Sequence, residues 1–147
     1  MSDITNFLGD DHRRCDELLF QAEQAMSSGD WATCQAQATA FHEALFHHLQ
    51  MEEDVLFPAF EQASGITQGP TVVMRGEHQD MRRLADELLD AAARKAGDDV
   101  AGVVDTLLIL IQQHNLKEEN VLYPMAEHHL GAAAADVVER MRNEVAA

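Results

Sequence analysis

Two stretches of this 147-residue chain are close copies of each other: HLQMEEDVLFP at residues 48–58 and HNLKEENVLYP at residues 114–124. They lie 66 residues apart, and the same shift carries an earlier histidine, His12, onto His78. In each half, the first histidine precedes the second by 36 residues. Self-similarity of this kind indicates that one supersecondary unit occurs twice. The chain therefore reads as two copies of one helical hairpin.

The spacing of apolar residues predicts helices in both copies. Between breaks at 27–30, 64–70 and 96–99, apolar residues recur every three or four positions, and no alternating strand pattern competes with them. Glycine at a break can take the left-handed conformation that ends a helix, and aspartate can cap the next helix. We therefore expect one all-α domain over residues 1–147, an up-down-up-down antiparallel four-helix bundle at about 3–127. A short fifth helix is expected at about 132–145.

Polar residues interrupt the apolar stripes at positions that the helical period assigns to the core. They are four histidines and two glutamates: His12, His48, Glu52, His78, His114 and Glu118. A lone core histidine needs only a hydrogen bond, but unpaired buried carboxylates are strongly disfavoured. The midpoint of each histidine pair falls in a predicted turn, at Asp30 and at Ala96. Because antiparallel helices place residues equidistant from a turn at one height, we expect the four histidines in one layer and the two glutamates one turn away on the same faces.

That layer has the composition of a transition-metal site, because imidazole nitrogens and carboxylate oxygens converge in an apolar core. The spacing of four residues from His48 to Glu52, and from His114 to Glu118, brings each pair to adjacent points. Two carboxylates between two histidine pairs suit a dinuclear centre in which each glutamate can bridge both ions. The absence of a partnered thiolate favours two iron ions, oxo- or hydroxo-bridged, over structural zinc. Zinc or another divalent ion can still occupy such a site after purification.

The order His12, His48-x-x-x-Glu52, His78, His114-x-x-x-Glu118 resembles the hemerythrin-like (HHE cation-binding) family over about residues 3–127. The match is to the bacterial subset with four histidines and two glutamates. The resemblance implies a four-helix bundle around a non-haem diiron centre, with these six residues as ligands. Oxygen-carrying members have a fifth histidine one turn after the third-helix histidine, and an aspartate five residues after the fourth-helix histidine. Arg82 and Glu119 stand at those positions here, so the resemblance argues against reversible oxygen carriage.

Residues beside the ligand stripe carry weaker signals. Glu53 and Glu119 recur with the repeat but point about 100° away from the stripe, so they either orient ligands or face solvent. Asp16, one turn after His12, is a further ligand candidate, but its counterpart in the repeat is Arg82 and we leave it out of the set.

The remaining residues of note have structural interpretations. Tyr123 and Phe57 are expected to close the bundle end rather than approach the metal. A proline follows each of them, and these prolines are expected to end or kink the ligand helices. Cys15 and Cys34 fall on apolar stripes and are expected to be buried free thiols. The other histidines are interpreted as surface residues: His42, His47, His128 and His129.

The charge of the chain limits its partners. Ten Lys and Arg against 26 Asp and Glu give a net charge of −16, which repels nucleic acid and anionic membrane surfaces. No apolar run approaches the ~20 residues of a membrane span, and the N-terminus lacks the features of a signal peptide. A cytoplasmic protein is therefore expected, and a monomer and a homodimer are both compatible with the sequence.

Three functions are compatible with such a centre. The leading hypothesis is a diiron protein that binds, senses or reduces a small oxidant (dioxygen, peroxide or nitric oxide) under oxidative or nitrosative stress. The alternative is iron sensing, storage or delivery without turnover, in which metal changes the surface offered to a protein partner that the sequence does not identify. The third is a scaffold with an adventitious metal. In the first two, metal binding is expected to be coupled to folding.

Overall fold

A computed structural model of the chain describes residues 3–144, and helices account for nearly all of them. The α-helices are α1 (Asp3–Ser27), α2 (Trp31–Met51), α3 (Phe57–Ser64), α4 (Pro70–Ala93), α5 (Gly97–Lys117), α6 (Tyr123–Leu130) and α7 (Ala134–Arg142). Two π-helical segments, η1 (Glu52–Leu56) and η2 (Glu118–Leu122), and one 3₁₀ turn, η3 (Gly131–Ala133), complete the list.

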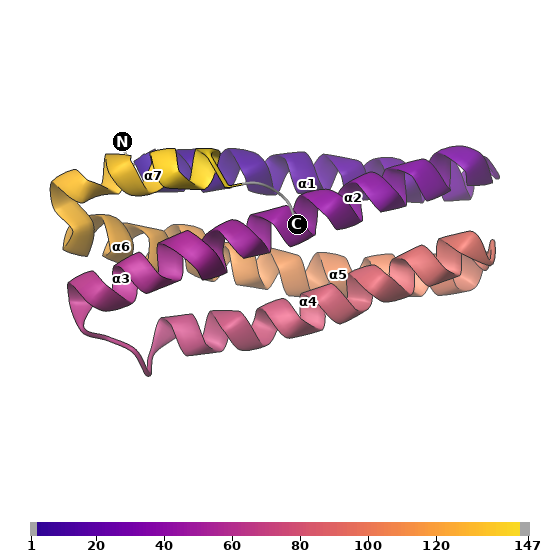
Figure 1. Cartoon of the computed structure of the whole chain (residues 1–147). Coiled ribbons are helices and arrows are strands. Elements are labelled where there is room, and N and C mark those ends of the chain that lie inside the picture. The colour runs from indigo at the N-terminus through magenta and orange to yellow at the C-terminus, as the bar shows by residue number, and fades with distance from the viewer. Residues whose placement is uncertain (1–2, 145–147) are drawn as a thin grey trace.

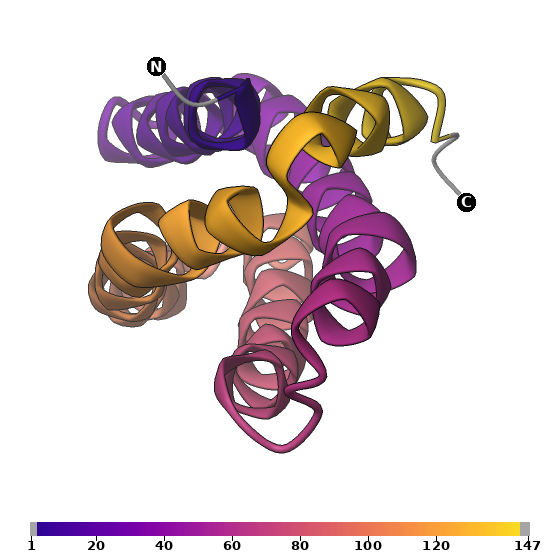
Figure 2. The same ribbon diagram turned by 90° about the vertical axis from the view of Figure 1, so that its left-hand side faces the viewer.

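These elements form four rods that lie side by side, as Figures 1 and 2 show. The rods are α1, the run α2–η1–α3, α4, and the run α5–η2–α6, joined by turns in antiparallel order. The predicted all-α four-helix bundle is confirmed. The predicted fifth helix is α7, which folds back over one end of the bundle and contacts α1 and η1. Val145, where its predicted range ends, lies outside the described residues.

The hairpin turns repeat in conformation more closely than in sequence. At the first turn Gly29 is left-handed (φ 78°), and Asp30 accepts a hydrogen bond from the backbone N–H of Thr33 at 3.1 Å. At the third turn the left-handed residue is Lys95 (φ 56°), the counterpart of Gly29 under the 66-residue shift. The expectation that Gly97 ends α4 is wrong, because the helix closes before it and Gly97 is the first residue of α5.

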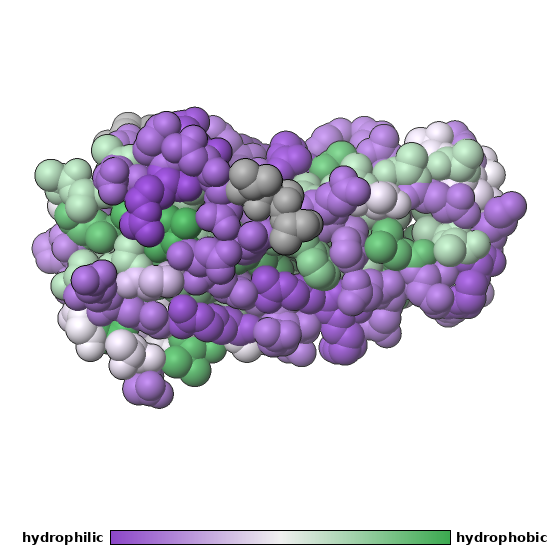
Figure 3. Space-filling view, in the orientation of Figure 1, coloured by the Kyte–Doolittle hydropathy of each residue, from purple (hydrophilic) through white to green (hydrophobic). Residues whose placement is uncertain are grey.

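The core is divided into two apolar clusters along the bundle. One lies toward the hairpin turns and includes Phe41 and Leu88, and the other lies toward α7 and includes Phe57 and Phe60. Both cysteines lie in the first cluster and are free and buried, as predicted, and burial raises the pKa of Cys15 to about 11. None of the described helices is long and apolar enough to cross a membrane. The face in Figure 3 is largely hydrophilic, with smaller apolar areas between the polar side chains.

A π-helical segment starts at each of the two glutamates predicted as ligands, Glu52 and Glu118. The backbone N–H of Phe57 bonds to the carbonyl of Glu52, and that of Tyr123 bonds to the carbonyl of Glu118, both over five residues. The next residue in each case is a proline, which has no N–H to give, and the chain continues as α3 or α6. The prolines therefore do not end the ligand helices, and the wider turn before each one changes which side chains face the core.

Candidate metal centre

The structure brings all six predicted site residues together between the two apolar clusters. None of them is more than 5% exposed. The donor atoms form two overlapping groups, and the atoms of each group all lie within 4.8 Å of one another. The first group is His12, His48, Glu52 and Glu118, and the second is Glu52, His78, His114 and Glu118. Each hairpin thus supplies the two histidines of one group, and both glutamates belong to both groups.

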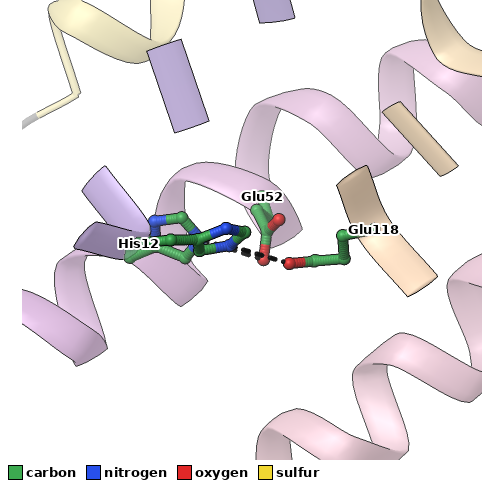
Figure 4. A group of neighbouring side chains, drawn as sticks. His12, Glu52 and Glu118 are labelled. Atoms are coloured by element: carbon green, nitrogen blue, oxygen red, sulfur yellow. Dashed lines mark hydrogen bonds and ion pairs between the residues drawn. The ribbon is translucent and has the colours of Figure 1, made fainter. Parts of the chain in front are cut away.

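Each glutamate contacts a histidine of the other hairpin. Glu52 comes from the first hairpin, and its Oε1 lies 3.1 Å from Nε2 of His78 in the second. Glu118 comes from the second hairpin, and its two oxygens lie 3.1 Å from Nε2 of His12 and 3.1 Å from Nε2 of His114. In Figure 4 the two carboxylates point toward one another beside His12. Bridging positions of this kind suit carboxylates that neutralise two cations at once.

A carboxylate fixes the outer nitrogen of every site histidine at 2.7 Å. The four Nδ1 contacts are His12–Glu119, His48–Asp11, His78–Glu53 and His114–Glu77. An acceptor at Nδ1 holds the imidazole in the tautomer whose Nε2 lone pair faces inward, as histidine ligands to metals require. Of the alternatives for Glu53 and Glu119, contact with the site histidines is the one observed.

Asp11 and Glu77 were missed by the sequence interpretation, although a signal for them exists. Each directly precedes the first histidine of its half, and the 66-residue shift maps Asp11 onto Glu77. They lie off the apolar stripe, and for that reason the helical period alone gives them no role. Within each hairpin this residue holds the second histidine, whereas the residue after each glutamate holds a histidine of the other hairpin.

The electrostatics of the layer couple these groups. Burial lowers the pKa of His114, but Glu118 and the surrounding carboxylates raise it to about 9. Burial likewise lowers the pKa of His48, and Glu52 and Asp11 raise it well above its ordinary value. For Glu53 burial raises the pKa, but hydrogen bonds from His78 and Arg82 bring it down to about 2. Cations inside the layer are therefore favoured, because carboxylates surround it on every side.

Tyr123 lies in the site, contrary to the expectation that it only closes the bundle end. Its hydroxyl donates to Glu52 Oε2 at 2.6 Å and to Glu118 Oε1 at 2.9 Å, and lies 3.2 Å from His12 Nε2. Burial raises the pKa of Tyr123, and the adjacent Glu118 and Glu52 raise it further, which keeps the hydroxyl protonated as a donor. Its counterpart Phe57 stacks on His78 with ring centroids 5.5 Å apart and offers no polar atom there.

The π-helical turn explains why the sequence interpretation missed Tyr123. In a regular helix, a residue five positions after Glu118 points about 140° away from it, since each residue turns the chain by ~100°. A bond between positions i and i+5 instead places Tyr123 almost one full turn after Glu118, on the same face. The available signal is the proline directly after each of these aromatic residues, because a proline inside a helix interrupts its regular hydrogen bonding.

The other candidates lie outside the donor groups. Arg82, at the position of the carriers' fifth histidine, donates to both oxygens of Glu53 at 2.8 and 3.1 Å. Within residues 3–144, Asp16 belongs to neither donor group and forms no ion pair with a site histidine. His42 instead pairs with Asp86, and His47 faces the backbone carbonyl of Glu144. His128 and His129 are exposed, as predicted.

The donor atoms fit a bound cation because most of them form no hydrogen bond within the described protein. Within residues 3–144, five buried atoms have no hydrogen-bond partner: Nε2 of His48, His78 and His114, Oε1 of Glu52 and Oε2 of Glu118. Buried polar atoms are rarely left unpaired, and here all five face one another. Metal bonds to nitrogen and oxygen are about 2.0–2.2 Å long, so donors around one ion lie within about 4.4 Å. A small contraction of each group meets that requirement.

Comparisons with known proteins agree with this geometry. The chain is 34% identical over 102 residues to the iron-sulfur cluster repair protein YtfE of Enterobacter sp. (strain 638), covering 60% of this chain and 44% of that protein. It is 30% identical over 105 residues to the uncharacterized protein Rv1995 of Mycobacterium tuberculosis, covering 67% of this chain and 41% of that protein. The chain thus spans less than half the length of these relatives.

No solved structure is significantly similar to the chain. The family model described as the hemerythrin HHE cation binding domain matches residues 3–126, which covers three rods, most of the fourth and all six predicted site residues. The chain belongs to the hemerythrin HHE cation-binding domain family.

Proposed function

We propose that this chain is a non-haem diiron protein whose centre binds, senses or reduces a small oxidant: dioxygen, peroxide or nitric oxide. The observation that carries the proposal is the layer of six converging donors, five atoms of which are buried and have no partner within residues 3–144. His12 and His48 would hold one ion, His78 and His114 the other, and Glu52 and Glu118 would bridge them. Iron supplies a site for the small ligand and electrons for its reduction.

The chain's own residues prepare this chemistry. Each ion would have up to four residues as donors, which would leave coordination positions for a small molecule if the ion takes six ligands. The apolar clusters on both sides, with Met81 and Leu45 in one and Met74 in the other, exclude bulk water. The Tyr123 hydroxyl is the one protein donor that reaches both bridging carboxylates in the described structure. It is placed to hold a proton beside the site.

The proposal excludes reversible oxygen carriage. In the oxygen-carrying members of the family a fifth histidine fills the position of Arg82, whereas here Arg82 binds Glu53, and an ion at this place would have two histidines. With more positions open, the reduced centre should oxidise to a stable diferric state. The test is to reduce the iron-loaded protein anaerobically, admit oxygen, and then remove it under vacuum. Recovery of the reduced spectrum over several cycles would overturn this part of the proposal.

The first experiment is metal analysis with an optical spectrum of the freshly purified protein. Two iron ions per chain with an oxo-bridged spectrum support the diiron proposal, and stoichiometric consumption of peroxide or nitric oxide by the reduced protein supports reactivity. Zinc that cannot be replaced by iron would contradict it.

A second candidate function, iron delivery, is favoured by the similarity to proteins named for iron-sulfur cluster repair. It predicts transfer of iron from the loaded protein to an acceptor without turnover of any oxidant. Because this chain spans less than half of those relatives, the comparison supports a shared metal centre rather than a shared overall activity.

A further inference from the structure

The outer carboxylates around the centre are not equally supported. Three of the four are held by a cation, in the pairs Arg14–Asp11, Arg82–Glu53 and Lys117–Glu77. The fourth is Glu119, which holds His12, and no Lys or Arg nitrogen in residues 3–144 lies within ion-pair distance of it. A carboxylate that holds a ligand but has no second partner is freer to move away.

The residue that would supply this cation is replaced by an acid. Arg82 lies one turn after His78 and supports Glu53, and the 66-residue shift maps Asp16, one turn after His12, onto this position. Partial burial raises the pKa of Asp16, the charge of His12 lowers it, and the charge of Glu119 raises it again, so Asp16 offers Glu119 repulsion where Arg82 offers Glu53 an ion pair. The two halves therefore carry side chains of opposite charge, Asp16 and Arg82, at equivalent positions of the repeat.

The cover over the centre is also thinner on this side. The Glu119 side chain is 34% exposed, against 23% for Glu53, and it lies beside Gly9, where the neighbouring side chain is that of Arg13, which pairs with Asp10. The counterpart of Gly9 in the second half is Arg75, whose guanidinium lies 5.3 Å from the centre of the Phe57 ring. Solvent therefore approaches the histidine on the first side more closely.

A protein hydroxyl is available to a site histidine on this side alone. The hydroxyl of Tyr123 lies 3.2 Å from Nε2 of His12, within hydrogen-bond distance. Nε2 of the other three site histidines has no such partner in the described residues. Losing an ion from the second half leaves two buried imidazole nitrogens that have a carboxylate oxygen at 3.1 Å but no hydrogen bond, whereas losing one from the first leaves only that of His48 without a hydrogen bond.

From these four differences we infer that the metal ion held by His12 and His48 is the exchangeable one, and that the ion held by His78 and His114 is retained. The inference rests on the two-ion centre of the proposed function. A retained ion beside an exchangeable one would let the protein give up iron while its bundle stays folded, which is the property that iron delivery needs.

The test is the rate of metal release. Protein loaded anaerobically with two ferrous ions per chain is mixed with excess of a coloured ferrous chelator. We expect two phases of one ion each. Glu119→Gln should accelerate only the fast phase. Removing a residue that holds a metal ligand typically lowers metal affinity about 10–100-fold, and the rate of release should rise by that factor if the rate of binding is unchanged. Its matched control, Glu53→Gln, should accelerate only the slow phase. Release of both ions in a single phase would overturn the inference.

A charge exchange gives the sharper test, because it exchanges the surroundings and leaves all six donors intact. Asp16→Arg installs the cation of the other half and should slow the fast phase about two- to fivefold, the effect of a partly exposed ion pair. Arg82→Asp should accelerate the slow phase by a similar factor. Far-UV circular dichroism verifies that each variant is folded. An unchanged fast phase in folded Asp16→Arg would contradict the inference.

The position of the remaining ion is found by anomalous diffraction from crystals of half-emptied protein. Density between His78 and His114 supports the inference, and density between His12 and His48 overturns it. Failure of the proposed two-ion centre can be distinguished from failure of this inference, because it would appear as fewer than two ions in the fully loaded protein. A single bound ion in that case should still lie at His78 and His114.

Discussion

In the first hairpin His12 stacks with Tyr123, and Gly9 lies beside Glu119, whereas in the second His78 stacks with Phe57, which Arg75 covers. The donor residue types are the same in both halves, and a carboxylate lies behind every imidazole. Donor identity decides which class of cation fits, and both halves share it. The surroundings decide how easily an ion leaves and what can protonate its ligand, and there the halves differ.

The largest effect is expected from removing what the two halves share. Glu52→Ala or Glu118→Ala removes a carboxylate that belongs to both donor groups, so each should lower iron content from two ions toward none. The increase in melting temperature on iron addition should be lost with it, since that stabilisation comes from binding to the folded state. Metal analysis and thermal denaturation with and without iron measure both effects.

The matched controls for this prediction differ in distance from the centre. Glu53→Ala and Glu119→Ala should each weaken binding by about 10–100-fold and leave the other half loaded. Asp54→Ala, an exposed neighbour, should change neither metal content nor stability. Equal losses in the ligand and outer-carboxylate variants would contradict the division between them.

The next largest effect is expected from the Tyr123 hydroxyl, which the second half lacks because Phe57 stands at the equivalent position. Tyr123→Phe leaves Glu52 and Glu118 without their shared donor and should destabilise the metal-free protein by about 1.5–3 kcal/mol. The iron-loaded protein should lose less, because the ions then satisfy the carboxylates. Urea denaturation of both forms measures the difference.

The reverse exchange sharpens this prediction. Phe57→Tyr, made in the Tyr123→Phe background, offers a hydroxyl to the second half, where Nε2 of His78 and Oε1 of Glu52 lie 3.1 Å apart but form no hydrogen bond. The double variant should regain part of the lost stability of the metal-free protein. A double variant no more stable than Tyr123→Phe would show that the halves differ in shape as well as in this one atom.

The repeat and the helical period are sufficient to predict the fold and the convergence of the six buried His and Glu side chains, because both signals report which face of a straight helix a residue occupies. Residues that depend on departures from a straight helix were not predicted. Tyr123 reaches the centre only through the π-helical turn, and Lys95 replaces the expected Gly97 at the end of α4.

The outer carboxylates were hidden for a different reason. Asp11 and Glu77 act across a helix interface, on a histidine of the neighbouring helix, so no spacing within one helix reveals them. The 66-residue shift pairs them, but a repeated acid beside a repeated histidine does not say which histidine it will meet. That information depends on the rotation of each helix, which packing determines.

The smallest effect tests how α7 breaks the symmetry of the repeat outside the centre. The helical period places Val55 and Val121 at equivalent core positions, yet Val55 is 4% exposed and Val121 is 51% exposed. The difference follows from α7, which contacts η1 and shares an apolar cluster with Val55. Val55→Ala should therefore cost about 1–2 kcal/mol in the free energy of unfolding, whereas Val121→Ala should stay within about 0.5 kcal/mol. Urea denaturation of the two variants under the same metal-free conditions measures both. A similar cost at the two positions would mean that α7 does not cover the first half in solution, and that the repeat is more symmetric than the structure indicates.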